Sequence, residues 1–141
     1  MQKIHFYFHE RKAVLSDRKK LKLYIDNLFI AEKKRLKTLA YIFCSDKYLL
    51  GINKGFLKHD FYTDVITFDL SDTKNEIHGE IYISIDRIIE NAKEMGILFN
   101  EELHRVIFHG ALHLCGYKDN EASEISKMRT MEDHYLSEYK K

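Results

Sequence analysis

The order of apolar and polar positions along the chain predicts four strands. Residues 3–8 alternate as a half-buried strand does, and residues 38–44 and 63–70 are rich in the β-branched and aromatic residues that favour strands. The turn-like residues 71–75 separate the third strand from a fourth at residues 76–84. We therefore expect the last two strands to pair as a hairpin.

Apolar residues at helical spacing predict the remaining elements. The expected helices cover residues 18–30, 46–53, 85–94, 101–114 and 120–139. We expect Ser16 or Asp17 to cap the first helix and Asn100 to cap the fourth, because their side-chain oxygens accept hydrogen bonds from free backbone N–H groups. Gly96 and Gly116 follow the third and fourth helices, where a glycine can adopt the left-handed conformation that ends a helix.

This mixed order of elements favours an α+β fold, with a small mixed sheet flanked by helices in three layers. No proline or low-complexity stretch marks a linker in the 141 residues, so we expect a single domain over residues 1–141. The composition, 45% apolar and 32% charged, is typical of a soluble globular protein. Two cysteines make no disulfide framework, and neither a signal peptide nor a membrane span is recognisable. We therefore expect a cytoplasmic protein without membrane association.

The net charge of +1 hides an uneven distribution. Residues 1–58 hold 14 Lys/Arg and 5 Asp/Glu, a difference of +9, whereas residues 59–141 hold 9 and 17, a difference of −8. A basic half can attract phosphate groups, but two solvated helix faces of opposite sign give the same counts. The charges alone favour the second interpretation.

The residues most suggestive of chemistry lie in the segment HGALHLCGYKD, residues 109–119. His109 and His113 are four apart, so on a helix they share one face and can reach one ion. Gly116 can turn the chain back so that Asp119 brings a carboxylate to the same point. Three such donors leave a fourth position open, as in catalytic zinc sites. The alternative is a pair of hydrogen-bonded core histidines, which the glycine and aspartate at these offsets disfavour.

The same spacing occurs in metzincin proteases, but one residue departs from their motif. In that motif the residue after the first histidine is a glutamate that serves as general base. Here that residue is Gly110, so peptide cleavage would lack its proton acceptor. The segment therefore favours a hydrolytic metal site of another kind.

With these residues the sequence resembles the YbeY family of bacterial endoribonucleases, which act in the maturation of ribosomal RNA. Residues 109–117 agree with the family signature HGxLHLxGYDH at every fixed position. Residues 63–68, TDVITF, are similar to a second family landmark, and residues 79–92 match a third, in which a Gly-Asp/Glu-Ile strand runs into a helix. The resemblance covers roughly residues 50–120.

The resemblance implies a metal-dependent endoribonuclease that cleaves single-stranded RNA, with one zinc ion or another divalent metal held by His109, His113 and Asp119. It also implies a role in maturation of the 3′ end of 16S ribosomal RNA and in ribosome quality control. The expected partners are single-stranded and ribosomal RNA, and ribosomal particles or ribosomal proteins. Two alternatives stay open, namely a ribosome-assembly factor whose metal is mainly structural and a metal-dependent hydrolase of another substrate.

Three positions depart from the family pattern. Asp119 stands where the family has a third histidine, and a carboxylate is also an accepted zinc ligand, with a harder oxygen that widens the choice of metal. Lys118 stands where the family has aspartate. Leu57 aligns with a functional arginine of the family.

The segment around Leu57 holds the candidate catalytic residues. Lys58 and His59 lie next to it, and either can supply a cation, although a lysine does not reproduce a guanidinium group. Asp64 is a candidate general base, with a hydrogen bond in a turn as its alternative role. Aromatic residues of the same segment either stack on RNA bases or pack in the core: Phe56, Phe61 and Tyr62.

Overall fold

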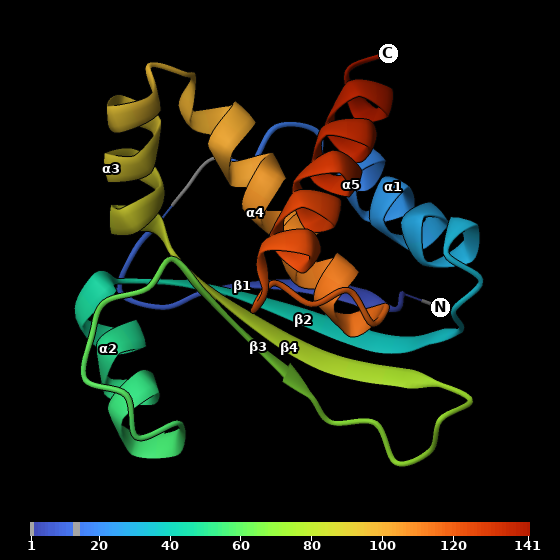
Figure 1. Cartoon of the computed structure of the whole chain (residues 1–141), viewed down its shortest axis with the longest axis horizontal. Coiled ribbons are helices and arrows are strands. Elements are labelled where there is room, and N and C mark those ends of the chain that lie inside the picture. Colours follow the sequence, from blue (N-terminus) through green and yellow to red (C-terminus); the bar gives the residue numbers. More distant parts are fainter. Residues whose placement is uncertain (1, 13–14) are drawn as a thin grey trace.

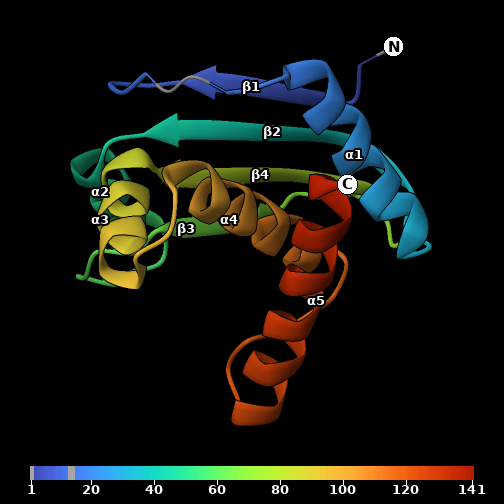
Figure 2. The same ribbon diagram turned by 90° about the horizontal axis from the view of Figure 1, so that it is seen from above.

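Four strands form one mixed sheet in the computed structural model, which describes residues 2–12 and 15–141 (Figure 1). The strands lie in the order β1-β2-β4-β3, which Figure 2 shows from above. β1 (Ile4–Phe8), β2 (Leu36–Cys44) and β4 (Ile77–Ser84) run parallel to one another. β3 (Val65–Asp69) pairs antiparallel with β4, which confirms the predicted hairpin and makes β3 an edge strand.

Helices cover the two faces of the sheet unequally (Figure 1). On one face lie α1 (Arg18–Ala31), α3 (Ile85–Met95), α4 (Phe99–Leu114) and α5 (Ala122–Lys140). On the other lies α2 (Asp46–Phe56). This arrangement confirms the predicted α+β fold with three layers. In the part of the chain that the structure describes, no helix is long and apolar enough to cross a membrane.

β4 contributes side chains to an apolar core on each face of the sheet. Ile81 and Ile83 belong to the larger core, which α4 covers, whereas Tyr82 packs against the smaller core that contains Leu49 and Ile66. Successive residues of a strand point to opposite faces, so the alternation along β4 follows from its sequence. The central strand thereby sets the position of α4, which carries the two histidines of the predicted metal site.

The starts of the helices agree with the sequence in one case and differ in another. α1 begins after Asp17, whose side chain accepts the capping hydrogen bond, as predicted. The prediction that Asn100 caps α4 is wrong, because α4 begins at Phe99 and Asn100 lies within its first turn. The N–H of Glu101 already reaches the carbonyl of Leu98 at 3.1 Å, so backbone bonding starts the helix earlier than the side chains suggest.

Candidate metal centre

One flank of α4 borders a cavity of about 670 Å³. The other walls are β3, the segment before β3 and the turn that follows α4. Three lining residues lie close enough together to share one ion: His109, His113 and Asp119. The sequence therefore identified a group of side chains that do meet in space.

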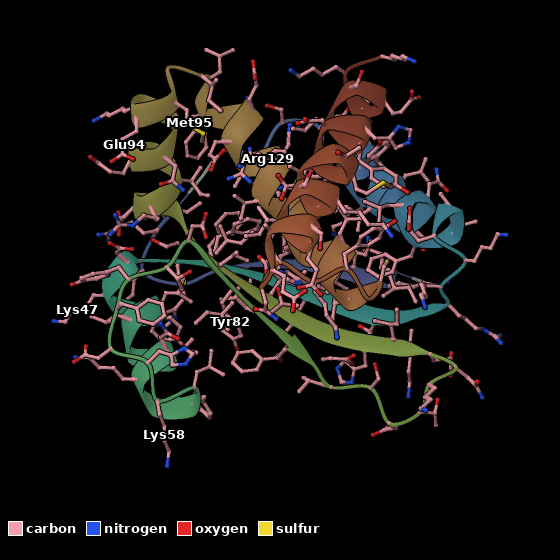
Figure 3. The ribbon with its side chains drawn as sticks, in the orientation of Figure 1. Lys47, Lys58, Tyr82, Glu94, Met95 and Arg129 are labelled. Carbon is pink, nitrogen blue, oxygen red and sulfur yellow. The ribbon has the colours of Figure 1, made fainter. Side chains whose placement is uncertain are left out.

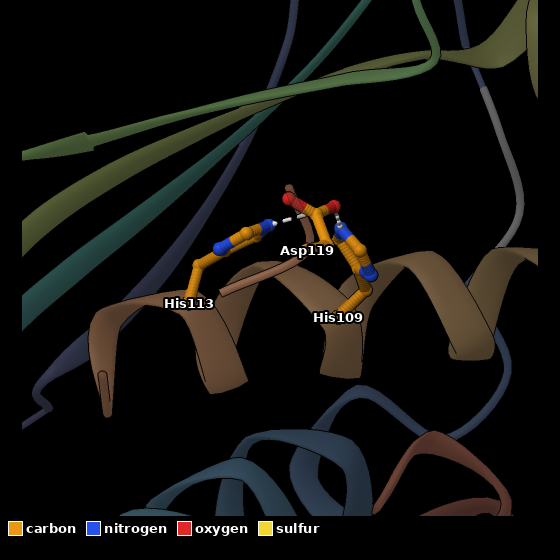
Figure 4. Close-up of side chains that lie close together, drawn as sticks. All are labelled: His109, His113 and Asp119. Atoms are coloured by element: carbon orange, nitrogen blue, oxygen red, sulfur yellow. Dashed lines mark ion pairs between the residues drawn. The ribbon is translucent and has the colours of Figure 1, made fainter. Parts of the chain in front are cut away.

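His109 and His113 project from the same face of α4 (Figure 4). Their ring centroids are 4.6 Å apart and the rings are almost perpendicular, at 82°. The backbone turns back at Gly116, whose φ of 107° lies in the region that favours glycine. This turn brings Asp119 above the rings, with its Oδ2 3.4 Å from Nε2 of His109 and 3.3 Å from Nε2 of His113.

These distances fit the dimensions of a tetrahedral metal site. With metal–ligand bonds of about 2.0–2.1 Å, neighbouring donor atoms of a tetrahedron lie about 3.3–3.4 Å apart. Both N···O distances at Asp119 have this length. Three protein donors leave one tetrahedral position for water or substrate, which is the composition of catalytic rather than structural zinc sites.

The hydrogen bonds behind the rings decide which nitrogens face Asp119. Nδ1 of His113 lies 3.0 Å from the carbonyl oxygen of Tyr117, and Nδ1 of His109 lies 2.6 Å from Oε2 of Glu132. A carbonyl and a carboxylate accept hydrogen bonds, so each Nδ1 carries a proton, and each ring in its neutral form would present the Nε2 lone pair toward Asp119. Two lone pairs and a carboxylate aimed at one point repel one another unless a cation lies between them. The donor chemistry therefore fits a bound metal ion.

Glu132 belongs to a buried ionic network that sequence analysis missed. Arg105 donates to Glu102 at 2.6 Å and to Glu132 at 3.0 Å, and both carboxylates are buried. Burial raises the pKa of Glu132, but hydrogen bonds from His109 and Arg105 outweigh it and hold that pKa below its ordinary value. Glu132 therefore stays ionised between a cation and the imidazole that it orients.

A signal for this network exists in the sequence of α5. The buried positions of that helix are Met128, Glu132, Tyr135 and Tyr139, so a carboxylate occupies an otherwise apolar stripe. A carboxylate in such a position requires a partner, because charges are rarely buried alone. The pattern could have identified Glu132 as a buried acid, although it contains nothing about its partner.

Asp64 lies in the wall of the same cavity, just before β3. Its carboxylate accepts a hydrogen bond from the Asn91 amide at 3.2 Å. Burial raises the pKa of Asp64 above its ordinary value, although the nearby guanidinium of Arg105 opposes this effect. Asp64 is thus a partly desolvated carboxylate that faces the cavity of the candidate metal ligands.

The two candidates from the segment before β3 differ in position. His59 lines the cavity, as does Leu57, the residue that aligns with the family arginine. Lys58 is not among the lining residues, and Figure 3 shows its side chain extending from the end of α2 away from the sheet. The hypothesis that Lys58 supplies a cation to this site is therefore not supported by its position.

The packing around Gly110 explains why the glutamate of the protease motif does not occur at this position. A Cβ atom at this position would lie 2.8 Å from side-chain atoms of Ile81 on β4. Position 110 therefore faces the sheet, where α4 packs too closely for a side chain, and does not face the cavity. A glutamate there would meet the core and could not act as a base at the metal site.

Two histidines and a carboxylate that could hold one ion, in the wall of a cavity of an α+β domain, are typical of a metal-dependent hydrolase. Comparison with known proteins specifies the class further. The chain belongs to the YbeY family, because the family model described as Endoribonuclease YbeY matches residues 7–140. Members of this family are endoribonucleases, and therefore hydrolases that act on RNA.

Several relatives cover most of the chain. It is 46% identical over 134 residues to the Endoribonuclease YbeY of Cytophaga hutchinsonii, covering 95% of this chain and 94% of that protein. It is 44% identical over 114 residues to that of Bacteroides thetaiotaomicron, covering 81% and 82%. A Thermotoga maritima protein solved in solution has a similar fold, with a TM-score of 0.63, 27% identity and coverage of 95% and 88%.

Proposed function

We propose that this chain is a metal-dependent endoribonuclease that cleaves single-stranded ribosomal RNA in the cytoplasm, as one domain over residues 1–141. The observation that carries the proposal is the convergence of His109, His113 and Asp119 in the wall of one cavity. Relatives named Endoribonuclease YbeY support RNA as the substrate. Ribosomal particles or ribosomal proteins are the partners we propose on the same family relationship.

Zinc is the ion we propose for the site. Two imidazole nitrogens and one carboxylate oxygen are donors that zinc accepts, and the N···O spacing is that of its tetrahedron. Because a carboxylate replaces the third histidine of the family, manganese and nickel are worth testing beside zinc.

In the proposed mechanism, His109, His113 and Asp119 hold the ion, which when bound polarises a phosphoryl oxygen and lowers the pKa of a water ligand. Glu132 and the carbonyl of Tyr117 hold the two rings by Nδ1, so that both Nε2 atoms keep their direction. The remaining requirement is a group that accepts a proton from the attacking water.

Asp64 is the general base that we propose. Its carboxylate lies in the same cavity, and the amide of Asn91 holds one oxygen in place. Burial raises its pKa, and a carboxylate with a raised pKa is a stronger proton acceptor at neutral pH. Asp64 would take a proton from the attacking water as its oxygen bonds to phosphorus, and the leaving oxygen would take a proton from solvent as its bond to phosphorus breaks.

The proposal is tested with purified protein on a labelled single-stranded RNA and on the same sequence as a duplex. Zinc-loaded wild-type protein is expected to cleave the single strand and to lose this activity in excess chelator. His113→Ala is expected to reduce cleavage by roughly 100-fold or more, since it removes a metal ligand. His134→Ala, a change at an exposed histidine of α5, is the matched control and should leave cleavage intact. Cleavage by His113→Ala at the wild-type rate would overturn the proposal.

One observation favours a second function, that of a ribosome-assembly factor with a mainly structural metal. Leu57 lines the cavity at the position of the family arginine, and Lys58 beside it does not line the cavity. An Asp119→Ala variant separates the two functions. Loss of RNA cleavage with unchanged co-sedimentation with ribosomal particles would favour an assembly role beside catalysis, whereas co-sedimentation of a wild-type protein that does not cleave RNA would favour assembly alone.

A further inference from the structure

We propose that His59 and Phe61 form a stacking platform for an unpaired nucleobase in the wall of the metal cavity. This inference rests on the proposed RNA substrate and specifies how the site would hold it. It concerns a segment to which the metal-binding motif assigns no role, and it explains why the site would act on single strands.

The two rings form a preassembled aromatic surface that is open to solvent. The His59 and Phe61 rings are stacked, with centroids 5.2 Å apart and planes 20° apart. Both residues line the cavity that also contains His109 and His113. Phe61 remains 56% exposed, so one face of this pair has no partner within the described part of the chain.

The exposure of the neighbouring aromatic residues excludes the alternative that this segment packs in the core. Phe56 and Tyr62 are 76% and 55% exposed. Large apolar side chains that gather on a surface usually mark a binding site, because leaving them in water is unfavourable. Of this group it is Phe61 that lines the cavity, which restricts the proposed platform to the ring beside the metal-binding residues.

A buried side chain fixes the shape of the segment that carries the platform. Asn53, near the end of α2, is 2% exposed, and its amide donates to the carbonyl of Phe61 at 2.8 Å. Its backbone carbonyl accepts from the N–H of His59 at 3.0 Å. Both platform residues are therefore tied to one buried asparagine, and the site is formed before a ligand arrives. Such preorganisation reduces the entropy lost on binding.

The charges of the cavity favour a nucleobase over a phosphate group as the ligand of the wall formed by His59 and Phe61. Among the described residues, Arg105 is the only lysine or arginine that lines the cavity, and both of its carboxylate partners already neutralise it. Phosphate recognition in this wall would need a free cation, whereas an aromatic face binds the uncharged surface of any base. Bases of a duplex are already stacked on one another, so such a platform selects single strands.

Binding is best measured by fluorescence anisotropy, with the zinc-loaded full chain and a labelled 2′-O-methyl hexaadenylate. A second probe has the same backbone with every base removed. Phe61→Leu keeps an apolar side chain but removes the ring, and it is expected to weaken hexaadenylate binding by roughly fivefold or more. Binding of the base-free probe should not change. Phe61→Tyr should restore hexaadenylate binding, because it restores a ring.

Phe56→Leu is the matched control, since Phe56 is exposed on the same segment but does not line the cavity. It should bind both probes as the wild type does. The platform is overturned if Phe61→Leu binds hexaadenylate normally, if it loses both probes equally, or if the wild-type protein binds the two probes alike.

Cleavage of unmodified RNA by the same proteins separates this inference from the proposed function. The platform predicts a raised KM for Phe61→Leu with a smaller change in kcat. If the wild-type protein cleaves RNA and Phe61→Leu binds and cleaves RNA as well as the wild type, the platform is refuted and the nuclease proposal stands. If the wild-type protein does not cleave RNA, but Phe61→Leu weakens hexaadenylate binding and leaves the base-free probe unaffected, the nuclease proposal is refuted and the platform is supported.

Discussion

The two flanks of α4 contain carboxylates in opposite electrostatic situations. Toward α5, Glu102 and Glu132 are buried and share the guanidinium of Arg105. Toward the cavity, Asp64 has an amide as its side-chain hydrogen-bond partner, and Asp119 faces the Nε2 atoms of His109 and His113. Paired buried charges hold elements in register, whereas carboxylates without a neutralising cation are available to a metal ion or a substrate proton. We call the paired group the structural flank and the group at the cavity the chemical flank, and Arg105 of the structural flank also lines the cavity.

The largest effect is expected on the chemical flank. Asp64→Asn should reduce RNA cleavage by roughly 100-fold or more, because it removes the proposed proton acceptor. Metal content should stay at the wild-type level, since Asp64 is not one of the three converging donors. Steady-state cleavage rates and elemental analysis of the same preparations provide the test. Wild-type cleavage by this variant would exclude Asp64 as the base.

The same variant should be more stable than the wild type at neutral pH. The raised pKa means that the folded state disfavours the ionised carboxylate of Asp64. Wild-type stability therefore falls as pH rises from about 4, the ordinary value, through the raised pKa of the folded state. Asp64→Asn should lack this fall in urea unfolding curves recorded across that pH range. If the variant were less stable than the wild type at neutral pH, the predicted direction of this stability change would be wrong.

Substitutions in the structural flank should mainly lower the free energy of unfolding. Glu132→Ala leaves Arg105 buried without one of its two carboxylates, and loss of one partner of such a pair costs about 3 kcal/mol. Urea unfolding of the metal-free protein measures this effect without a contribution from metal binding. Glu138→Ala on the same helix, where the carboxylate is exposed and contacts Lys141, should leave the unfolding midpoint unchanged. Equal midpoints for the two variants would remove the distinction between the flanks.

A smaller effect is expected on zinc affinity, through the contact between Glu132 and His109 that links the two flanks. Glu132→Gln keeps the size of the side chain but removes the charge that faces Nδ1 of His109. Zinc affinity is expected to fall by roughly 10- to 100-fold, because the hydrogen-bonded carboxylate raises the basicity of the imidazole and orients it. Competition with a chromogenic chelator measures this affinity, with Glu101→Gln as a control on α4. Unchanged affinity would mean that Glu132 serves packing alone.

The residues of the candidate metal centre could be recognised from sequence because they are close along the chain. The spacing of His109 and His113 places them on one helical face, and a glycine that ends the helix returns the chain within a few residues to Asp119. The hairpin of β3 and β4 was predictable for the same reason. These features depend on local periodicity and turn chemistry, which the amino-acid sequence determines directly.

The partners of those residues were decided by tertiary structure. Glu132 is 23 positions from His109, and it reaches Nδ1 only because α5 packs against α4. Asp64 enters the same cavity because β3 takes the edge of the sheet beside α4, in a strand order that periodicity does not specify. Helical and strand patterns identify which side chains are buried, but long-range packing selects the neighbours that each buried charge finds.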